Sequence, residues 1–151
     1  MDINRITQVN ENVTRAFSKL VPQLTGRKEY PSLEELERVI RSENTHLFVA
    51  TEGDEVMGTL TLVFYQIPSG LKAWIEDVIV NESFRGKGVA TALLCHALHI
   101  ARDKGARKVD LTSAPSRGAA NRLYQKLGFE QRETNVYRLY LSGEKQKTPC
   151  W

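Results

Sequence analysis

The centre of the chain changes its hydrophobic period, and this change restricts the fold to the α/β class. Residues 73–80, AWIEDVIV, are rich in apolar and β-branched side chains and predict a strand. From Gly88 the apolar positions return at helical spacing until Lys104-Gly105, where the glycine suits a helix end. Residues 106–114, ARKVDLTSA, predict the next strand. A helix that connects two strands in this way implies a parallel pair at the centre of the sheet.

The remaining segments predict an antiparallel meander before this crossover, and a helix and a strand after it. Asn10 or Asn12 can cap a first helix, and Ser32 with Glu35 forms a capping box for a second helix that ends near Ser42. The other expected elements are strands at residues 4–9, 46–52, 55–66 and 129–141 and a helix over residues 116–128, capped by Ser116.

Length and charge limit the classes of function. The chain has 151 residues, enough for one domain, which we place at residues 1–141, followed by a polar tail at residues 142–151. Twenty-one Lys and Arg against 18 Asp and Glu give a net charge of +3, too mild to indicate nucleic-acid binding. No apolar run approaches the roughly 18 residues of a membrane span, and no signal peptide is recognisable, so a cytoplasmic location is expected. Cys95 and Cys150 form neither a disulfide framework nor a metal-ligand pattern, so no metal is expected.

Residues 83–94, SFRGKGVATALL, join the central strand to its helix through two glycines and two cations. Free amides at a helix N-terminus form a general anion site, and glycines let a phosphate approach the backbone. A P-loop would need Ser or Thr after Lys87, where Gly88 stands. A dinucleotide-binding turn would need a third glycine where Thr91 stands. Both nucleotide interpretations are therefore disfavoured.

Residues 85–90, RGKGVA, match the pattern R-x-x-G-x-A, and here the chain resembles the GNAT superfamily of N-acetyltransferases, whose signature is Q/R-x-x-G-x-G/A. IEDVIV before the loop, VATALL after it and ANRLYQKLGF at residues 120–129 resemble the family's central strand, pyrophosphate helix and C-terminal motif. The resemblance covers residues 46–140, whereas residues 1–45 match only in general layout. It implies a single-domain GNAT-like fold, with a mixed, mostly antiparallel sheet of six or seven strands, a splayed parallel pair and about four flanking helices.

The resemblance also implies acetyl-coenzyme A (acetyl-CoA) as co-substrate. Its pyrophosphate would be received by consecutive backbone amides, with charge added by two cations: the amides of Gly86, Lys87, Gly88, Val89, Ala90 and Thr91, and the side chains of Arg85 and Lys87. The pantetheine arm would lie like an extra strand against the backbone of Val78, Ile79 and Val80. Asn121 resembles the family's side-chain contact to the cofactor, and Tyr124 stands where many members keep a tyrosine directed at the thioester sulfur. From the residues alone, Asn121 is equally a surface polar group and Tyr124 equally a core residue.

Acetyl transfer to an amine needs an uncharged amine, a stabilised oxyanion and a proton for the departing thiolate. Tyr124 suits the last task, because a phenol can donate this proton. A backbone N–H of Val78 or Ile79 could polarise the carbonyl. Glu76 is our preferred base, acting directly or through water, while Asp77 and a solvent relay remain alternatives. Strand alternation sends only one of the two carboxylates toward the acceptor.

The leading hypothesis is therefore an acetyl-CoA-dependent N-acetyltransferase that works by direct attack in a ternary complex. Its acceptor would be a small-molecule amine or a protein or peptide amine, and the alternative is a non-catalytic module that binds or senses acyl-CoA. In the family, acceptor selectivity usually lies in segments matching residues 12–43 and about 130–137, where the resemblance is weakest. Residues 25–31, TGRKEYP, are either a charged loop between helices or a lid over the site. The sequence does not determine the oligomeric state, although homodimers are common among proteins of this resemblance.

Overall fold

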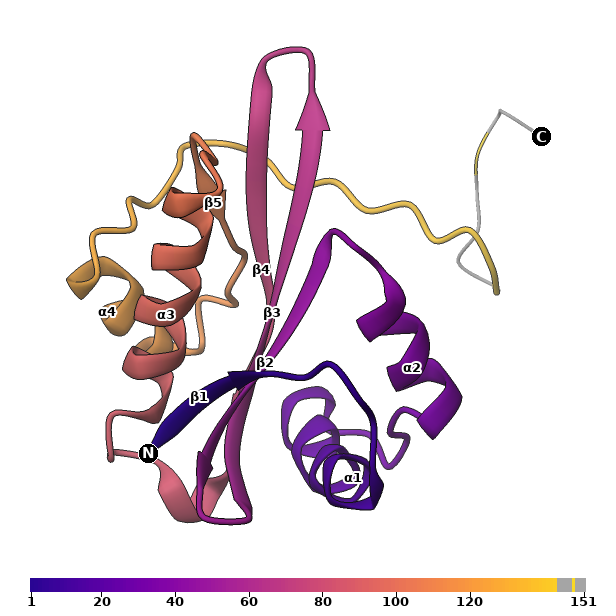
Figure 1. The fold of residues 1–151 in the computed structure, drawn as a ribbon. Coiled ribbons are helices and arrows are strands. Elements are labelled where there is room, and N and C mark those ends of the chain that lie inside the picture. Colours follow the sequence, from indigo (N-terminus) through magenta and orange to yellow (C-terminus); the bar gives the residue numbers. More distant parts are fainter. Residues whose placement is uncertain (144–147, 149–151) are drawn as a thin grey trace. The chain divides into compact units, whose positions relative to one another are not determined.

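The computed structural model of the chain describes residues 1–143 and 148 (Figure 1). The chain divides into two compact units, Met1–Thr112 and Ser113–Trp151. A single domain over residues 1–141 stays a prediction, and most of the expected tail lies outside the described residues.

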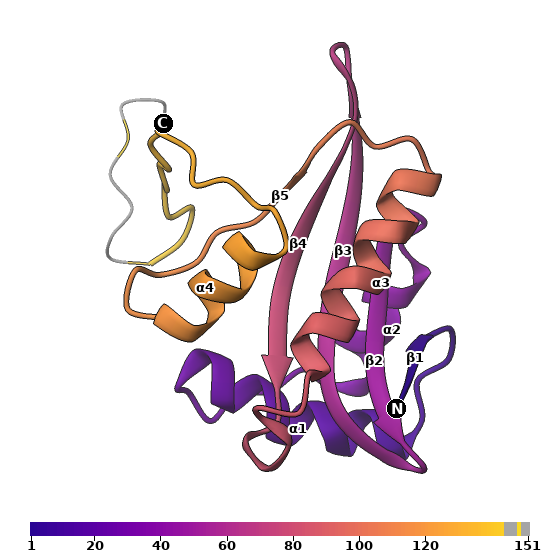
Figure 2. The ribbon, with the colours of Figure 1, turned by 90° about the vertical axis from the view of Figure 1, so that its left-hand side faces the viewer.

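A five-stranded sheet forms the framework of the first unit (Figure 2). Its strands are, in spatial order, β1 (Asp2–Arg5), β2 (Thr45–Glu52), β3 (Glu55–Ile67), β4 (Gly70–Val80) and β5 (Val109–Asp110). Strands β1 to β4 pair antiparallel, and β4 pairs parallel with β5 through Ala73 and Trp74. The predicted meander and the predicted parallel pair are therefore confirmed. The parallel pair lies at the edge of the sheet rather than at its centre, because no described strand pairs with the outer edge of β5.

Helices α1 (Glu11–Thr25) and α2 (Leu33–Arg41) cover one face of this sheet (Figure 1). Asn10 caps α1 by accepting a hydrogen bond from a backbone N–H of its first turn at 3.0 Å. Ser32 and Glu35 form the predicted capping box of α2, with bonds of 3.2 and 2.8 Å. The apolar sides of both helices share one buried cluster with strand β2: Val13, Phe17, Leu36, Leu47 and Val49.

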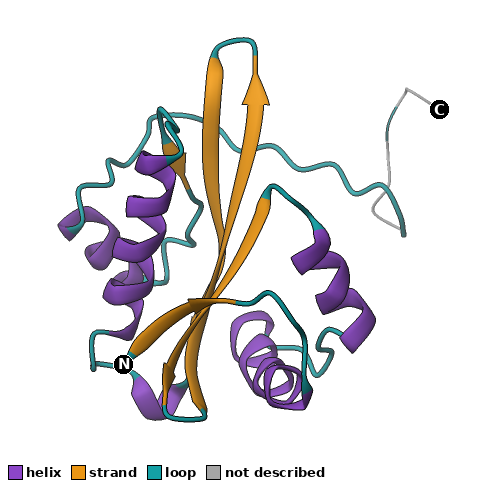
Figure 3. Cartoon of the chain, in the orientation of Figure 1, coloured by secondary structure: helices purple, strands orange, loops and turns teal. Residues whose placement is uncertain are grey.

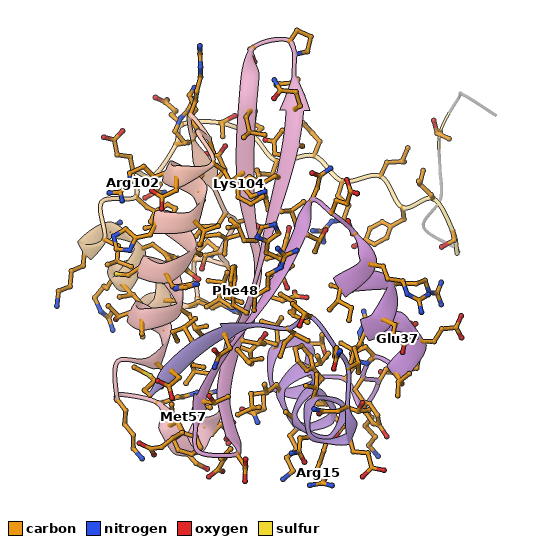
Figure 4. All side chains as sticks on the ribbon, viewed as in Figure 1. Arg15, Glu37, Phe48, Met57, Arg102 and Lys104 are labelled. Atoms are coloured by element: carbon orange, nitrogen blue, oxygen red, sulfur yellow. The ribbon has the colours of Figure 1, made fainter. Side chains whose placement is uncertain are left out.

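Helix α3 (Val89–Asp103) covers the opposite face of the sheet (Figure 1). Gly58 of β3 permits a close approach here, because a Cβ at this position would lie 3.2 Å from Val89 Cγ1 and 3.4 Å from Leu93 Cδ1 of α3. Phe48 of β2 lies in the layer between the sheet and α3, with its ring centre 4.9 Å from that of His96 (Figure 4). This packing holds α3 against the sheet and thereby positions the loop that connects β4 to α3.

His46 lies next to Phe48 in this apolar layer and is 4% exposed. Its ring is edge-on to Phe64 at 5.2 Å, and its Nε2 has no hydrogen-bond partner among the described residues. Burial, with smaller contributions from the positive charges of Arg5 and Lys104, lowers the pKa of His46 to about 4. The imidazole is therefore neutral near pH 7 and acts as a core side chain.

We expect His46 to make the chain less stable as the pH falls from about 6.5 to about 4. The unfolded imidazole takes up a proton below pH 6.5, whereas the folded one stays neutral until about pH 4. Its contribution to the free energy of unfolding is complete above pH 6.5, and the two pKa values imply a loss of up to about 3 kcal/mol at the acid end. Urea unfolding of wild type and His46→Leu at several pH values measures this loss, since the variant cannot titrate there. His99→Leu, at an exposed position of α3, is the control. A difference between wild type and His46→Leu that is constant with pH would contradict the prediction.

The second unit contains helix α4 (Gly118–Lys126), and the strand expected over residues 129–141 does not form (Figure 3). Helix α4 begins after Arg117 rather than after the predicted cap Ser116. A strand needs a neighbouring strand to complete its backbone hydrogen bonds, and apolar composition alone does not supply one. The apolar side chains that predicted the strand are exposed: Val136, Tyr137, Leu139, Tyr140 and Leu141. The expectation of six or seven strands is therefore corrected to five within the described residues, and the expectation of about four helices agrees with the four α-helices found there.

Candidate active site

The loop between β4 and α3 begins with a capped turn. Asn81 follows β4, and its Oδ1 accepts a hydrogen bond from Ser83 N at 3.2 Å. A short 3-10 helix, η1 (Glu82–Phe84), comes next. Gly86 and Gly88 then have φ values of 75° and 78°, a region that residues with a Cβ rarely adopt. The two glycines therefore let the backbone turn into the first residues of α3.

Six consecutive backbone N–H groups at this point have no hydrogen-bond acceptor among the described residues. They belong to the residues predicted as the phosphate cradle: Gly86, Lys87, Gly88, Val89, Ala90 and Thr91. The first hydrogen bond into the helix runs from Ala92 N to Gly88 O at 3.0 Å, and no side chain caps the helix start. Free donors and the positive end of the helix dipole coincide here, an arrangement suited to a phosphate.

The two predicted cations lie at the start of this run, Arg85 just before it and Lys87 within it, and both contact the preceding 3-10 helix. A guanidinium nitrogen of Arg85 lies 3.7 Å from Glu82 Oε1, and both side chains are mostly exposed. Lys87 Nζ lies 4.9 Å from the ring centre of Phe84. Exposed contacts of this kind contribute little stability, so both cations can turn toward an anion at small cost.

Strand β4 offers an open edge just before the loop. β5 pairs with β4 only at Ala73 and Trp74, and no described strand pairs with that edge between Ile75 and Val80. On its other edge, the register with β3 shifts between Thr59 and Thr61. This open stretch includes the backbone of all three residues predicted to meet the pantetheine arm: Val78, Ile79 and Val80.

The two candidate bases lie at this register shift. Glu76 pairs with Thr61 on β3, and Thr61 pairs with Leu47 on β2. Directly paired residues point to the same face of a sheet. Leu47 packs against α1 and α2, so Glu76 lies on the face that these helices cover. Asp77 has a φ of 49°, a strained value for a residue with a Cβ. Its side chain is exposed overall, yet partial burial raises the pKa of its carboxyl above the ordinary value.

Asn121 and Tyr124 both lie on α4, in the second unit. The Nδ2 of Asn121 donates to Ala114 O at 3.0 Å, so the carboxamide also has a structural role within this unit. The ring of Tyr124 lies edge-on to that of Phe129 at 5.9 Å. Burial raises the pKa of the Tyr124 hydroxyl, and the charge of Arg117 opposes this shift.

A hollow of about 290 Å³ in the first unit contains none of the predicted site residues. It lies between α1 and the β2–β3 turn and is lined by both signs of charge, including Arg15, Lys19, Asp54 and Glu55. Within residues 1–143 and 148, no three His, Cys, Asp or Glu side chains gather where they could hold a metal ion. In the same part of the chain, no helix combines the length and the apolar character that crossing a membrane requires.

Comparison with known proteins decides the family. The profile of the Acetyltransferase (GNAT) family matches residues 9–129. The chain belongs to this family. Among curated relatives, N-alpha-acetyltransferase 30 of Schizosaccharomyces pombe is 31% identical over 98 residues, which cover 64% of each chain. Aminoglycoside N(6')-acetyltransferase type 1 of Salmonella typhimurium is 22% identical over 142 residues, which cover 91% of this chain and 97% of that relative.

The GNAT fold is also found in solved structures. Aminoglycoside N-acetyltransferase AAC(6')-Iy in complex with CoA matches with a TM-score of 0.74 and 21% identity, covering 92% of this chain and 98% of that one. At this identity the likeness concerns the fold. The chain spans 64%, 27% and 50% of the length of the first three curated relatives that it matches. The family membership therefore rests on the profile match over residues 9–129.

Three features of this GNAT chain were missed by the sequence prediction. Asn81 could have been detected, because an asparagine after a strand is typical of a turn in which its side chain bonds the backbone two residues further on. The strained backbone of Asp77 has no local signal, since it depends on the register between two strands. A contact from Gln23 of α1 to Glu82 joins residues 59 positions apart and also has no local signal.

Proposed function

We propose that this chain is an N-acetyltransferase that moves the acetyl group of acetyl-CoA to a primary amine by direct attack in a ternary complex. The observation that carries the proposal is the run of six free amides, from Gly86 to Thr91, at the start of α3. This run of amides lies directly after β4, a strand with an open edge. A site for the pyrophosphate next to a site for the pantetheine arm is required, because the two groups are joined in the donor.

The donor is held in three places. Its pyrophosphate accepts hydrogen bonds from the amides of Gly86 to Thr91, while Arg85 and Lys87 supply positive charge. The pantetheine arm extends along the backbone of residues 78–80 as an added strand would. Asn121 contributes a side-chain contact through the oxygen of its carboxamide, because its Nδ2 is engaged with Ala114. When bound, acetyl-CoA supplies the activated acetyl group.

Three groups act on the reacting atoms. Glu76 removes a proton from the acceptor ammonium, directly or through water, so that the amine can attack the thioester. A backbone N–H of Val78 or Ile79 stabilises the oxyanion. The hydroxyl of Tyr124 donates a proton to the departing thiolate, and burial, which raises the pKa of this hydroxyl, favours its protonated form. Attack forms the carbon–nitrogen bond and gives the oxyanion, and its collapse breaks the carbon–sulfur bond. The nitrogen then loses its second proton, which restores the hydroxyl of Tyr124, while Glu76 releases the first proton to solvent. The products are an amide, free CoA and one proton.

Glu76→Gln is expected to lower kcat about 100-fold, because a general base contributes on that order to rate. Asp77→Asn is the matched control, since it removes the neighbouring carboxylate at the same register shift. Steady-state kinetics across pH separates the two variants, because the lost base also removes the acid limb of the profile. A larger loss in Asp77→Asn than in Glu76→Gln would transfer the role of base to Asp77.

A panel of amines tests the function and identifies the acceptor. Relatives are named as N-alpha-acetyltransferase and aminoglycoside N-acetyltransferase, so the panel contains peptides with free N-termini and aminoglycosides. It also contains polyamines, amino acids and amino sugar phosphates, and release of free CoA is followed with a thiol reagent. Amine-dependent CoA release supports the proposal. Tight acetyl-CoA binding without release for any amine would favour the non-catalytic acyl-CoA-binding module instead.

A further inference from the structure

The residues that carry the six free amides, Gly86 to Thr91, are here called the donor loop. Gln23, near the end of α1, contacts the chain just before this loop. Its Oε1 accepts a hydrogen bond from Glu82 N at 3.2 Å, and its Nε2 donates to Lys19 O at 3.1 Å. The carboxamide is therefore held at both ends. Leu20, one turn earlier on α1, is 1% exposed, so this part of the helix is anchored in the core.

The bond from Gln23 completes the hydrogen bonding of the segment that leads into the donor loop. Every backbone N–H from Asn81 to Arg85 has an acceptor. In chain order the acceptors are Met57 O, Gln23 Oε1, Asn81 Oδ1, Asn81 O and Glu82 O. Among these, Gln23 is the one side chain from outside the loop. A fully bonded segment thus ends where the free amides begin.

We propose that Gln23 is a positioning residue for the donor loop. By holding Glu82, it fixes the turn from which the six free amides extend, so that they are arranged for a pyrophosphate before it binds. This inference rests on the proposed function, which assigns the pyrophosphate to these amides. Helix α1 covers the sheet face that carries Glu76, the proposed base. The bond from Gln23 therefore connects the donor loop to the helix that lies on the same face as this base.

Gln23→Met tests the inference, because methionine has a similar length and volume but makes neither hydrogen bond. In the unliganded chain, we expect faster hydrogen–deuterium exchange at the amide of Glu82. In calorimetry with CoA, we expect the Kd to rise about fivefold, the value of one hydrogen bond of about 1 kcal/mol. The kcat at saturating acetyl-CoA should stay within about twofold, since the lost interaction is present equally before and during reaction.

Two further variants separate positioning from general damage. Gln23→Glu keeps an acceptor for Glu82 N and is expected to restore slow exchange at that amide. Ser18→Ala removes a 2.7 Å bond from Ser18 Oγ to Arg15 O on the same helix and is expected to change neither exchange nor CoA affinity.

The outcomes distinguish this inference from the proposed function. Unchanged exchange in Gln23→Met would overturn the inference, and so would faster exchange with an unchanged Kd for CoA. A loss of kcat as large as the loss of affinity would also overturn it. If the wild-type chain binds no CoA, the proposed function is rejected, and exchange in the unliganded chain still decides whether Gln23 holds Glu82.

Discussion

Gly88→Glu is expected to raise the Kd of acetyl-CoA at least about 100-fold, which corresponds to about 3 kcal/mol of binding free energy. The new carboxylate would stand among the free amides of the donor loop, where it would repel the pyrophosphate and compete for the same donors. Gly88 also has a φ of 78°, so any side chain at this position strains the turn. Isothermal titration calorimetry with acetyl-CoA measures the effect.

The helix itself offers a matched control for this substitution. Gly105 follows the end of α3 and has a φ of 81°, and a Cβ at either Gly88 or Gly105 would meet no atom within 4 Å. Gly105→Glu therefore adds the same charge and a similar strain at the helix end that does not attract anions. Circular dichroism verifies that both variants fold. Equal affinity of Gly88→Glu and wild type would reject the loop as the pyrophosphate site, and so would equal losses in the two variants.

The turn and the helix start that make up the donor loop could be predicted from the sequence because their determinants are local. Gly86 and Gly88 mark the turn, and the helical period of the apolar residues after Gly88 marks where α3 begins. The caps of the first two helices are local for the same reason, and Asn10, Ser32 and Glu35 make the predicted bonds. A free amide at a helix start needs no distant partner, so its position follows from these signals alone.

Features that depend on distant residues could not be predicted in the same way. The sequence places Glu76 and Asp77 side by side but does not show the shift in register that strains Asp77. The bond from Gln23 to Glu82 forms because α1 packs against β3 and β4 of the sheet. Residues 129–141 have the composition of a strand, but pairing requires a neighbour that composition cannot specify.

Tyr124→Phe is expected to lower kcat about 100-fold or more while leaving the Kd of CoA within about twofold. The substitution keeps the ring that packs against Phe129 and removes only the hydroxyl that would protonate the thiolate. Burial raises the pKa of this hydroxyl above its ordinary value, so the group is a proton donor throughout the neutral range. Steady-state kinetics gives kcat, and calorimetry with CoA gives the affinity.

The pH profile shows whether Tyr124 acts as an acid. An acid must be protonated to work, so a raised pKa moves its loss of activity to more alkaline pH, and Tyr124→Phe should lack that alkaline limb. Tyr65→Phe on β3 removes a hydroxyl outside the proposed site and should behave as wild type. An unchanged kcat in Tyr124→Phe would reject the role of acid. Weaker CoA binding with an unchanged kcat would instead assign Tyr124 to packing, and protonation of the thiolate would then fall to solvent.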